Sequence, residues 1–219
     1  LSLLVGPLQS RAQEAEALRE RTLALDNDYF VFARDPRARS DDNYTHGITY
    51  TYTAAMPRIL RTAIACGPGA VCPLRVSVGQ WMFSPVNEAA DPLPGERPHA
   101  GFLFLSTEAQ RRTPATQMGV SVILGVTGPP SLAEATQRAF HAAVPGFREP
   151  LGWEHQLPTE VAGSAAVSLA SLRFFGDRER FGLQIVPDAA AEVGTLRAAG
   201  HTTVSGTVGW GVHHPWVSV

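Results

Sequence analysis

The chain contains no lysine. All 18 basic residues among its 219 residues are arginine, and 20 acidic residues bring the formal net charge to −2. The arginines are scattered along the sequence, without the clustered positive charge that proteins use to bind nucleic acids. The sequence therefore argues against nucleic acid as a partner. Internal repeats and low-complexity tracts are absent as well, so we expect one large domain.

Long hydrophobic runs are also missing. No apolar segment approaches the roughly 20 residues that a transmembrane helix needs. A protein with this sequence can reside in a membrane only as a β-barrel, because a barrel pairs every backbone N–H and C=O group between strands.

Cysteine is scarce, with only Cys66 and Cys72 in the chain. The Gly and Pro residues between them favour a tight reversal that brings the two thiols together. Two thiolates without nearby His or Cys partners are too few for a closed metal site. We therefore predict a Cys66–Cys72 disulfide in a protein exported to an oxidising compartment.

Residues 1–12 are typical of the end of a signal peptide. An apolar stretch from Leu1 to Leu8 precedes Ser10 and Ala12, which place small residues where a signal peptidase reads them. An ordinary disordered terminus is the alternative. The interpretation as a signal peptide predicts an exported protein with a single domain over residues 13–219.

Alternation of apolar and polar residues predicts an all-β protein. Over residues 45–53, Ile48, Tyr50 and Tyr52 alternate with threonines, which is the period-2 pattern of a strand. In a membrane barrel the bulky face meets lipid and the polar face lines the lumen, whereas a soluble sandwich shows the same alternation. The other predicted strands, which bring the total to about eight, are 22–32, 74–83, 101–110, 117–126, 160–175, 181–194 and 202–212. The aromatic residues expected to form an interfacial girdle are Tyr44, Tyr50, Tyr52, Trp81, Phe102 and Phe104.

One amphipathic helix is predicted between the strands. Ser131 and Glu134 have the spacing of a capping box, which opens a helix by satisfying its first backbone N–H groups. Gln137 and His141 then lie four residues apart and share one helix face. An imidazole and a carboxamide presented together indicate a catalytic site, whereas a surface or core histidine is the alternative interpretation.

Two polar clusters interrupt the strand pattern. Asn27 and Asp28 fall inside the first apolar strand, where unpaired polar groups are costly. Their oxygen atoms suit Ca²⁺, and Thr45 at the start of the next strand offers a hydroxyl to the same site. Because successive strand residues point to opposite faces, Asn27 and Asp28 share a site only near a bulge or a strand end. A turn or a solvated strand end is the alternative.

Over residues 22–212 the motifs of the chain, and the order in which they occur, resemble those of the outer-membrane lipid A 3′-O-deacylases. The motifs that carry the resemblance are Asn27-Asp28, Tyr44-Thr45-x-Gly47, Gly79-Gln80, Ser84-Pro85, Glu96-Arg97-Pro98-His99-Ala100-Gly101, Gly125-Val-Thr-Gly128-Pro129, Gln137-x-x-x-His141 and Gly152-Trp153-x-x-Gln156-Leu157.

The resemblance implies a monomeric, twelve-stranded barrel in the outer membrane of a Gram-negative cell. It implies Ca²⁺-dependent hydrolysis of an ester-linked acyl chain of lipid A, the membrane anchor of lipopolysaccharide. By the same match, His141 is the general base that activates water and Gln137 is its helical partner. Asn27, Asp28 and Thr45 match the polar residues that build the family's site. Asn27 and Asp28 also match the residues that surround its metal ion. A serine nucleophile is disfavoured, because the chain has no Gly-x-Ser-x-Gly elbow.

Two departures from the family keep alternatives open. Members of the family carry a functional lysine after the third strand, and this chain has none. Arg97 is a candidate to bind a lipid A phosphate instead, with a loop salt bridge as its alternative role. The sequence also ends after about eight strands, so we expect a barrel that lacks its C-terminal strands. A catalytically silent barrel that binds lipid, or a soluble exported barrel that binds a small ligand, are the competing functions.

Overall fold

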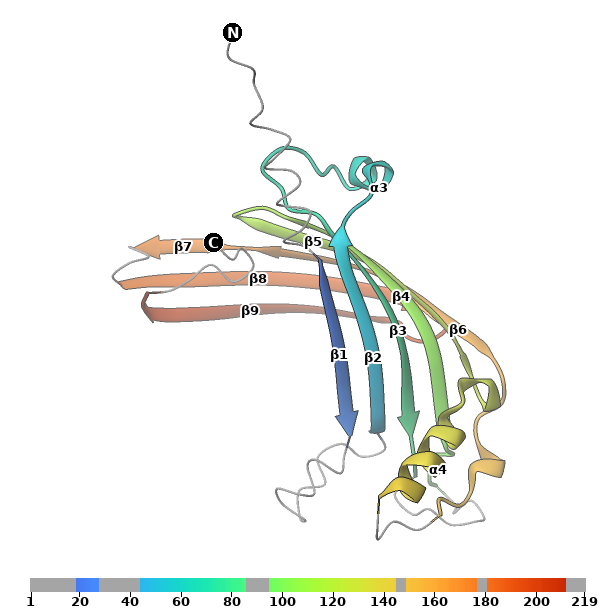
Figure 1. Ribbon diagram of the computed structural model, residues 1–219. Helices are drawn as coiled ribbons and strands as arrows, with labels where there is room; N and C mark the ends of the chain where they lie inside the picture. The colour runs from blue at the N-terminus through green and yellow to red at the C-terminus, as the bar shows by residue number, and fades with distance from the viewer. Residues whose placement is uncertain (1–18, 28–43, 86–94, 145–148, 177–180, 212–219) are drawn as a thin grey trace.

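The computed structural model describes residues 19–27, 44–85, 95–144, 149–176 and 181–211. They form one antiparallel sheet of nine strands that curves into an open wall (Figure 1). Strands β1 to β6 are neighbours in chain order, and β8 follows, paired with β6, β7 and β9. The strands are β1 (Glu20–Asn27), β2 (Tyr44–Ala55), β3 (Pro73–Phe83), β4 (Ala100–Arg112), β5 (Thr116–Thr127), β6 (Val161–Ser171), β7 (Arg173–Gly176), β8 (Phe181–Gly194) and β9 (Ala199–Trp210), and the helices are α3 (Arg58–Ala63), α4 (Ala133–Ala143) and the short 3-10 turns η1 (Pro129–Ser131) and η2 (Trp153–His155).

The all-β, antiparallel prediction is confirmed, with two differences in detail. The predicted segment 160–175 is split at Leu172 into β6 and β7. The sequence pattern also missed α3, whose six residues are too few to show a helical period and include no buried residue. Residues 28–32 of the first predicted strand lie outside the described residues. Among the described helices, none is long and apolar enough to cross a bilayer.

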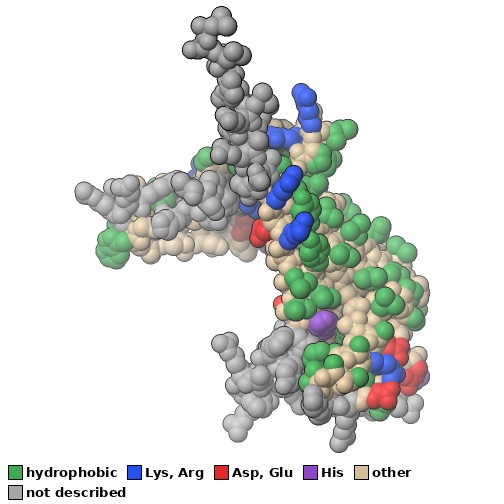
Figure 2. All heavy atoms as spheres, in the orientation of Figure 1, with side chains coloured by type: hydrophobic (Ala, Val, Ile, Leu, Met, Phe, Trp, Pro, Cys, Tyr) green, Lys and Arg blue, Asp and Glu red, His purple; other side chains and the backbone are tan. Residues whose placement is uncertain are grey.

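Strand register sorts the side chains into two continuous faces. Leu23, Tyr50, Val78, Leu105 and Leu124 pair in one row across β1 to β5. These side chains are between 42% and 60% exposed, and they lie on the convex side of the wall, which we call the outer face (Figure 2). The threonines that alternate with Tyr50 point the other way, as the sequence pattern predicted.

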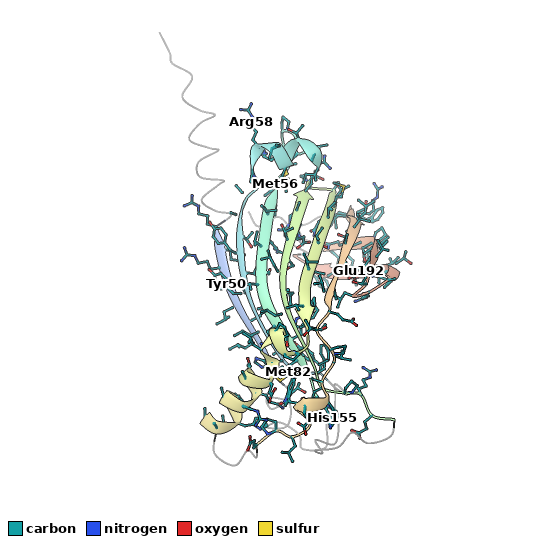
Figure 3. The ribbon with its side chains drawn as sticks, turned by 90° about the vertical axis from the view of Figure 1, so that its right-hand side faces the viewer. Tyr50, Met56, Arg58, Met82, His155 and Glu192 are labelled. Atoms are coloured by element: carbon teal, nitrogen blue, oxygen red, sulfur yellow. A yellow bond between two sulfur atoms is a disulfide. The ribbon has the colours of Figure 1, made fainter. Side chains whose placement is uncertain are left out.

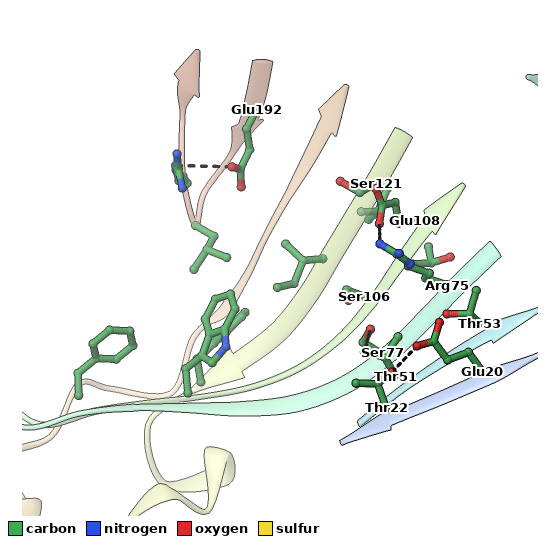
Figure 4. Close-up of a pocket in the computed structure, with 18 residues that line it drawn as sticks. Glu20, Thr22, Thr51, Thr53, Arg75, Ser77, Ser106, Glu108, Ser121 and Glu192 are labelled. Atoms are coloured by element: carbon green, nitrogen blue, oxygen red, sulfur yellow. Dashed lines mark hydrogen bonds and ion pairs between the residues drawn. The ribbon is translucent and has the colours of Figure 1, made fainter. Parts of the chain in front are cut away.

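The concave, inner face is polar and holds every acidic residue of the described strands. These residues are Glu20, Asp26, Glu108, Asp188 and Glu192. Glu108 forms an ion pair with Arg75 at 3.4 Å and accepts a hydrogen bond from Gln110 at 2.5 Å. Serine and threonine hydroxyls line a cavity of about 840 Å³ together with Glu20, Glu108 and Glu192 (Figure 4). An apolar outer face and a polar inner face are the pattern of a membrane barrel wall.

Four of the six residues expected in a lipid-facing girdle lie on the inner face instead, namely Tyr44, Trp81, Phe102 and Phe104. The Trp81 and Phe104 ring centroids are 4.6 Å apart, and the Phe102 and Phe104 centroids are 5.7 Å apart. Gly79 makes room for this cluster, because a Cβ atom there would come within 2.6 Å of the Phe104 ring. The rings therefore fill the inside of the wall, and Tyr50 remains on the outer face.

The β2–β3 connection, which includes α3, forms a small separate core from residues on either side of that helix. Its buried residues are Met56, Ala70 and Cys72, and they pack against Leu74 and Ala109, which belong to the outer-face rows of β3 and β4. A disulfide joins Cys66 to Cys72, with their Cα atoms 6.4 Å apart. The connection is thus folded over the outer side of the wall.

The two faces are tested by placing the same charge on adjacent residues of β5. Val122 is on the outer face and 47% exposed, whereas Ser121 lines the inner cavity. We expect Val122→Arg to destabilise the protein folded in lipid vesicles, lowering its free energy of unfolding by about 2–4 kcal/mol. This is the cost of a cation at the lipid-facing midplane. The matched Ser121→Arg variant should fold nearly as well as the unmodified protein. Equal losses in the two variants, measured by denaturant titration, would contradict the assignment of faces.

Candidate active site

Helix α4 lies across the ends of β3 and β4, at the opposite end of the wall from α3 (Figures 1 and 3). Ala133 and Gln137, four residues apart, are its buried residues. Ala133 packs with Met82, which lies in the outer-face row of β3, and with Trp153. The helix therefore packs against the outer face of the wall rather than closing the inner cavity.

A close approach of backbone to helix explains how α4 begins. A Cβ atom at Gly101 of β4 would lie 2.4 Å from the Ala133 Cβ atom and 2.1 Å from Ser131 Oγ. Only glycine leaves this space, and Ser131, which is fully buried, fills it. The Ser131 carbonyl accepts a hydrogen bond of 2.6 Å from Gln80 Nε2. The η1 turn is thereby fixed to the wall immediately before the helix.

The predicted capping box is wrong. Helix α4 begins at Ala133, and its N-cap is Leu132, which takes a left-handed conformation with φ at 60° and has no capping side chain. Ser131 Oγ accepts a hydrogen bond of 3.4 Å from the backbone N–H of Ala133, the first helical residue, and not from the third N–H as the box requires. Glu134 instead forms an ion pair with Arg138 at 3.0 Å. Arg138 also contacts Glu149. The hydrogen bond from Arg138 to Glu134 raises the pKa of Arg138, which stays charged on the exposed side of the helix.

A chain of hydrogen bonds runs from the loop after α4 through the helix to β2. Trp153 Nε1 donates to Gln137 Oε1 at 2.6 Å, and Gln137 Nε2 donates to Ser84 Oγ at 3.5 Å. The Ser84 backbone N–H then donates to Thr45 Oγ1 at 3.1 Å. Gln137 is 4% exposed and Trp153 is fully buried. The carboxamide is therefore held on both sides, and its hydrogen bonds fix the rotation of the helix on the wall.

Thr45 reaches this chain because β2 bulges there. In the β2–β3 ladder Tyr44 pairs with Phe83 and His46 with Met82, so Thr45 is the extra residue. Asn27, the last residue of β1, pairs with His46 beside the bulge. The backbone thus brings the Asn27 and Thr45 positions to one end of neighbouring strands. Asp28 lies outside the described residues, and so does the side chain of Asn27.

His141 lies one turn beyond Gln137 on the same helix. The spacing of Ala133, Gln137 and His141, each four residues from the next, keeps all three on one side of α4. His141 is half-buried, unlike the helix residues Ala142 and Ala143, which are exposed. The structure therefore brings His141, Gln137 and Thr45 to one region of the outer face.

The remaining predicted ligands are less well placed by the described residues. Arg97 is exposed in the segment before β4, close in sequence to His99. The His99 ring packs against Trp153, with centroids 4.6 Å apart and the planes tilted by 47°. Within the described part of the chain, no group of three His, Cys, Asp or Glu residues could hold a metal ion. The expected Ca²⁺ site, with Asp28 as its acidic ligand, is therefore not tested by these residues.

Sequence reasoning missed the structural roles of Gln80, Ser84 and Trp153, although it used all three as landmarks. Gln80 interrupts the apolar outer-face row of β3 with a polar group. In a lipid-facing strand, such a residue indicates that something covers it, and here η1 does so. This single interruption was the available indication that the helix docks on the outer face.

Taken together, the two-faced antiparallel wall and the helix docked on its outer face define a β-barrel type of wall with a candidate site on that face. The family model described as "Outer membrane protein LpxR" matches residues 1–218 of this sequence. The chain belongs to the LpxR family of outer membrane proteins, which confirms the resemblance carried by its motifs.

A solved structure supports the same fold. LpxR from Salmonella typhimurium matches with a TM-score of 0.66 at 18% sequence identity, over 86% of this chain and 62% of the solved chain. The chain thus spans less than two thirds of that relative. No curated protein sequence matches it.

The hydrogen bond to Gln137 is tested by Trp153→Phe, which keeps a ring in the pocket but removes the indole N–H. Leaving a buried acceptor without its donor costs about 1–3 kcal/mol. We expect amide hydrogen exchange in α4 to accelerate about tenfold or more, with the strands unaffected. Trp210→Phe is the matched control, because Trp210 is 82% exposed on β9. Indistinguishable exchange in α4 for both variants would show that the bond does not hold the helix.

Proposed function

We propose that this protein hydrolyses an ester-linked acyl chain of lipid A in the outer membrane, as a 3′-O-deacylase. The observation that supports this most directly is the position of His141 on a helix held against the outer face. The outer face of the same wall carries exposed apolar residues such as Leu105 and Leu124. A lipid substrate can therefore approach from the bilayer while its ester lies beside the imidazole.

In the proposed reaction His141 acts as the general base. Its imidazole takes a proton from water as the water oxygen bonds to the ester carbonyl carbon. The tetrahedral intermediate then releases the sugar oxygen, which receives a proton from the imidazolium. The products are a free fatty acid and a sugar hydroxyl. Gln137 serves this step by fixing the rotation of the helix, because its carboxamide hydrogen bonds to Trp153 and Ser84.

We propose that Ca²⁺ binds beside this helix, with Asn27 and Asp28 as ligands and Thr45 completing the polar site. Carboxylate, carboxamide and hydroxyl oxygens are the hard donors that Ca²⁺ prefers. The pairing of Asn27 with His46 next to the bulge supports a shared location with Thr45. When bound, the cation would polarise the ester carbonyl and stabilise the developing negative charge.

Arg97 is the proposed contact for a lipid A phosphate. It is exposed in the segment that leads into β4, at the same end of the wall as α4. Guanidinium groups bind phosphate through paired hydrogen bonds, so an arginine is a chemically suitable replacement for the missing lysine. A catalytically silent relative would keep such binding and lack turnover.

The role of His141 is tested by His141→Ala. We expect deacylation to fall by about 10²–10⁴-fold, the usual contribution of a general base, with the barrel still folded. His155→Ala is a suitable control, since His155 is exposed in η2 and outside the proposed reaction. The measurement is the release of fatty acid from lipid A in mixed micelles. Near-normal turnover of His141→Ala would exclude the mechanism but not the fold.

The metal is tested by chelation. Activity should disappear in excess chelator and return when Ca²⁺ is added back. Asp28→Ala should weaken this response strongly, because it removes a charged ligand, whereas Thr45→Ala should have a smaller effect. Full turnover in chelator would remove Ca²⁺ from the mechanism and leave His141 to act with protein groups alone.

A further inference from the structure

The outer face carries an uncompensated ring of positive charge at the end of the wall opposite α4. Its members, which we call the arginine collar, are Arg21, Arg58, Arg61, Arg111 and Arg173. Arg21, Arg111 and Arg173 lie in the outer-face rows of β1, β4 and β7. Arg58 and Arg61 lie on α3. In Figure 2 basic side chains gather at this end of the molecule, and Figure 3 shows Arg58 there.

Neighbouring turns bring these residues to one level of the wall. Arg111 is next to the last residue of β4, just before the turn to β5. Leu172, which precedes Arg173, donates its backbone N–H to the carbonyl of Ala115 in that turn at 2.8 Å. Arg21 is at the start of β1, and it shares the outer face with Leu23, two residues further along the strand. The collar therefore follows the rim from β1 through α3 to β7.

The disulfide loop places α3 at the edge of the apolar outer face. Its small core packs on outer-face side chains of β3 and β4, and Arg111 Nε donates to the carbonyl of Ala65 at 3.1 Å. Ile59 of α3 is 81% exposed beside Arg58. A helix that presents exposed apolar and cationic side chains together is suited to the boundary between lipid tails and headgroups.

The collar arginines differ from three arginines elsewhere in the described structure. Arg75, Arg138 and Arg197 form ion pairs with glutamates. Within the described residues, no collar residue forms an ion pair, and no acidic residue of the strands lies on the outer face. In the described strands, negative charge is confined to the inner face by the strand register. A partner that fits this surface must therefore bring its own negative charge.

The apolar surface beside the collar identifies that partner. Arg21 is two residues from Leu23, which is 60% exposed, and it pairs with Tyr52, which is 37% exposed. Two strand residues span about 7 Å, so the guanidinium lies one headgroup layer beyond the lipid-facing surface. Long arginine side chains extend to that layer, where tyrosine is also favoured.

We propose that the arginine collar binds the phosphate groups of anionic phospholipids in the leaflet on the α3 side of the membrane. Guanidinium groups form paired hydrogen bonds with phosphate, and an anionic membrane surface attracts each arginine near it. The bound lipids would set the depth of the barrel and keep α4 at the opposite surface. This role is independent of the proposed deacylation.

Lipid selectivity tests the proposal. The purified protein is reconstituted in vesicles of equimolar phosphatidylcholine and phosphatidylglycerol and re-extracted, and the lipids that remain bound are quantified by mass spectrometry. The test variant combines Arg21→Gln, Arg58→Gln, Arg61→Gln and Arg173→Gln, and it keeps Arg111 because of its bond to the Ala65 carbonyl. Arg197→Gln is the control, since Arg197 lines the inner cavity.

We expect the unmodified protein and the control to retain mainly phosphatidylglycerol. In the combined variant, the ratio of bound phosphatidylglycerol to phosphatidylcholine should fall by a factor of at least about five. One arginine near an anionic surface contributes a factor of about this size. Enrichment in the unmodified protein should also fall between about 0.05 M and 0.5 M salt. Should the combined variant fail to fold, the salt series and the single variants Arg21→Gln and Arg173→Gln decide the question. Salt-independent binding, no enrichment, or equal enrichment in the variants would overturn the proposal.

Discussion

The hydrogen bond between the Trp153 indole and the Gln137 carboxamide is the interaction on which the site depends. Helix α4 lies on a wall face that is otherwise apolar, where an unpaired buried carboxamide would cost about 1–3 kcal/mol. Trp153 and Ser84 satisfy it, and Ser84 in turn binds Thr45 at the bulge of β2. These hydrogen bonds hold α4 on the outer face. Because they do so, they also set the position of His141 relative to the end of β2.

Much of the architecture was predictable because it follows from local periodicity. Alternation along β2 predicted both the strand and the side on which Tyr50 and Thr53 lie, since a one-residue shift would reverse both faces. The fourfold spacing of Gln137 and His141 likewise predicted a shared helix face. The ordered motifs predicted the family, which the match over residues 1–218 confirms.

The rest depends on contacts between segments distant in sequence. The aromatic residues Trp81, Phe102 and Phe104 have the composition of a lipid-facing girdle, but register places them on the inner face beside Gly79. The start of α4 depends on the space above Gly101, which Ser131 and Ala133 fill, and not on a capping box with Glu134. Likewise, the bulge that makes Thr45 available appears only when β2 is aligned with β3. No local pattern contains this information.

The central claim is that the region around His141 removes an acyl chain from lipid A at the outer face of the barrel. Expression of the protein in a Gram-negative host with defined lipid A, followed by mass spectrometry of the extracted lipid A, tests it most directly. A new lipid A species whose mass is lower by one ester-linked acyl group, absent from the host alone, is the expected result. Unchanged lipid A in cells that hold the folded protein in their outer membrane would contradict the proposed activity.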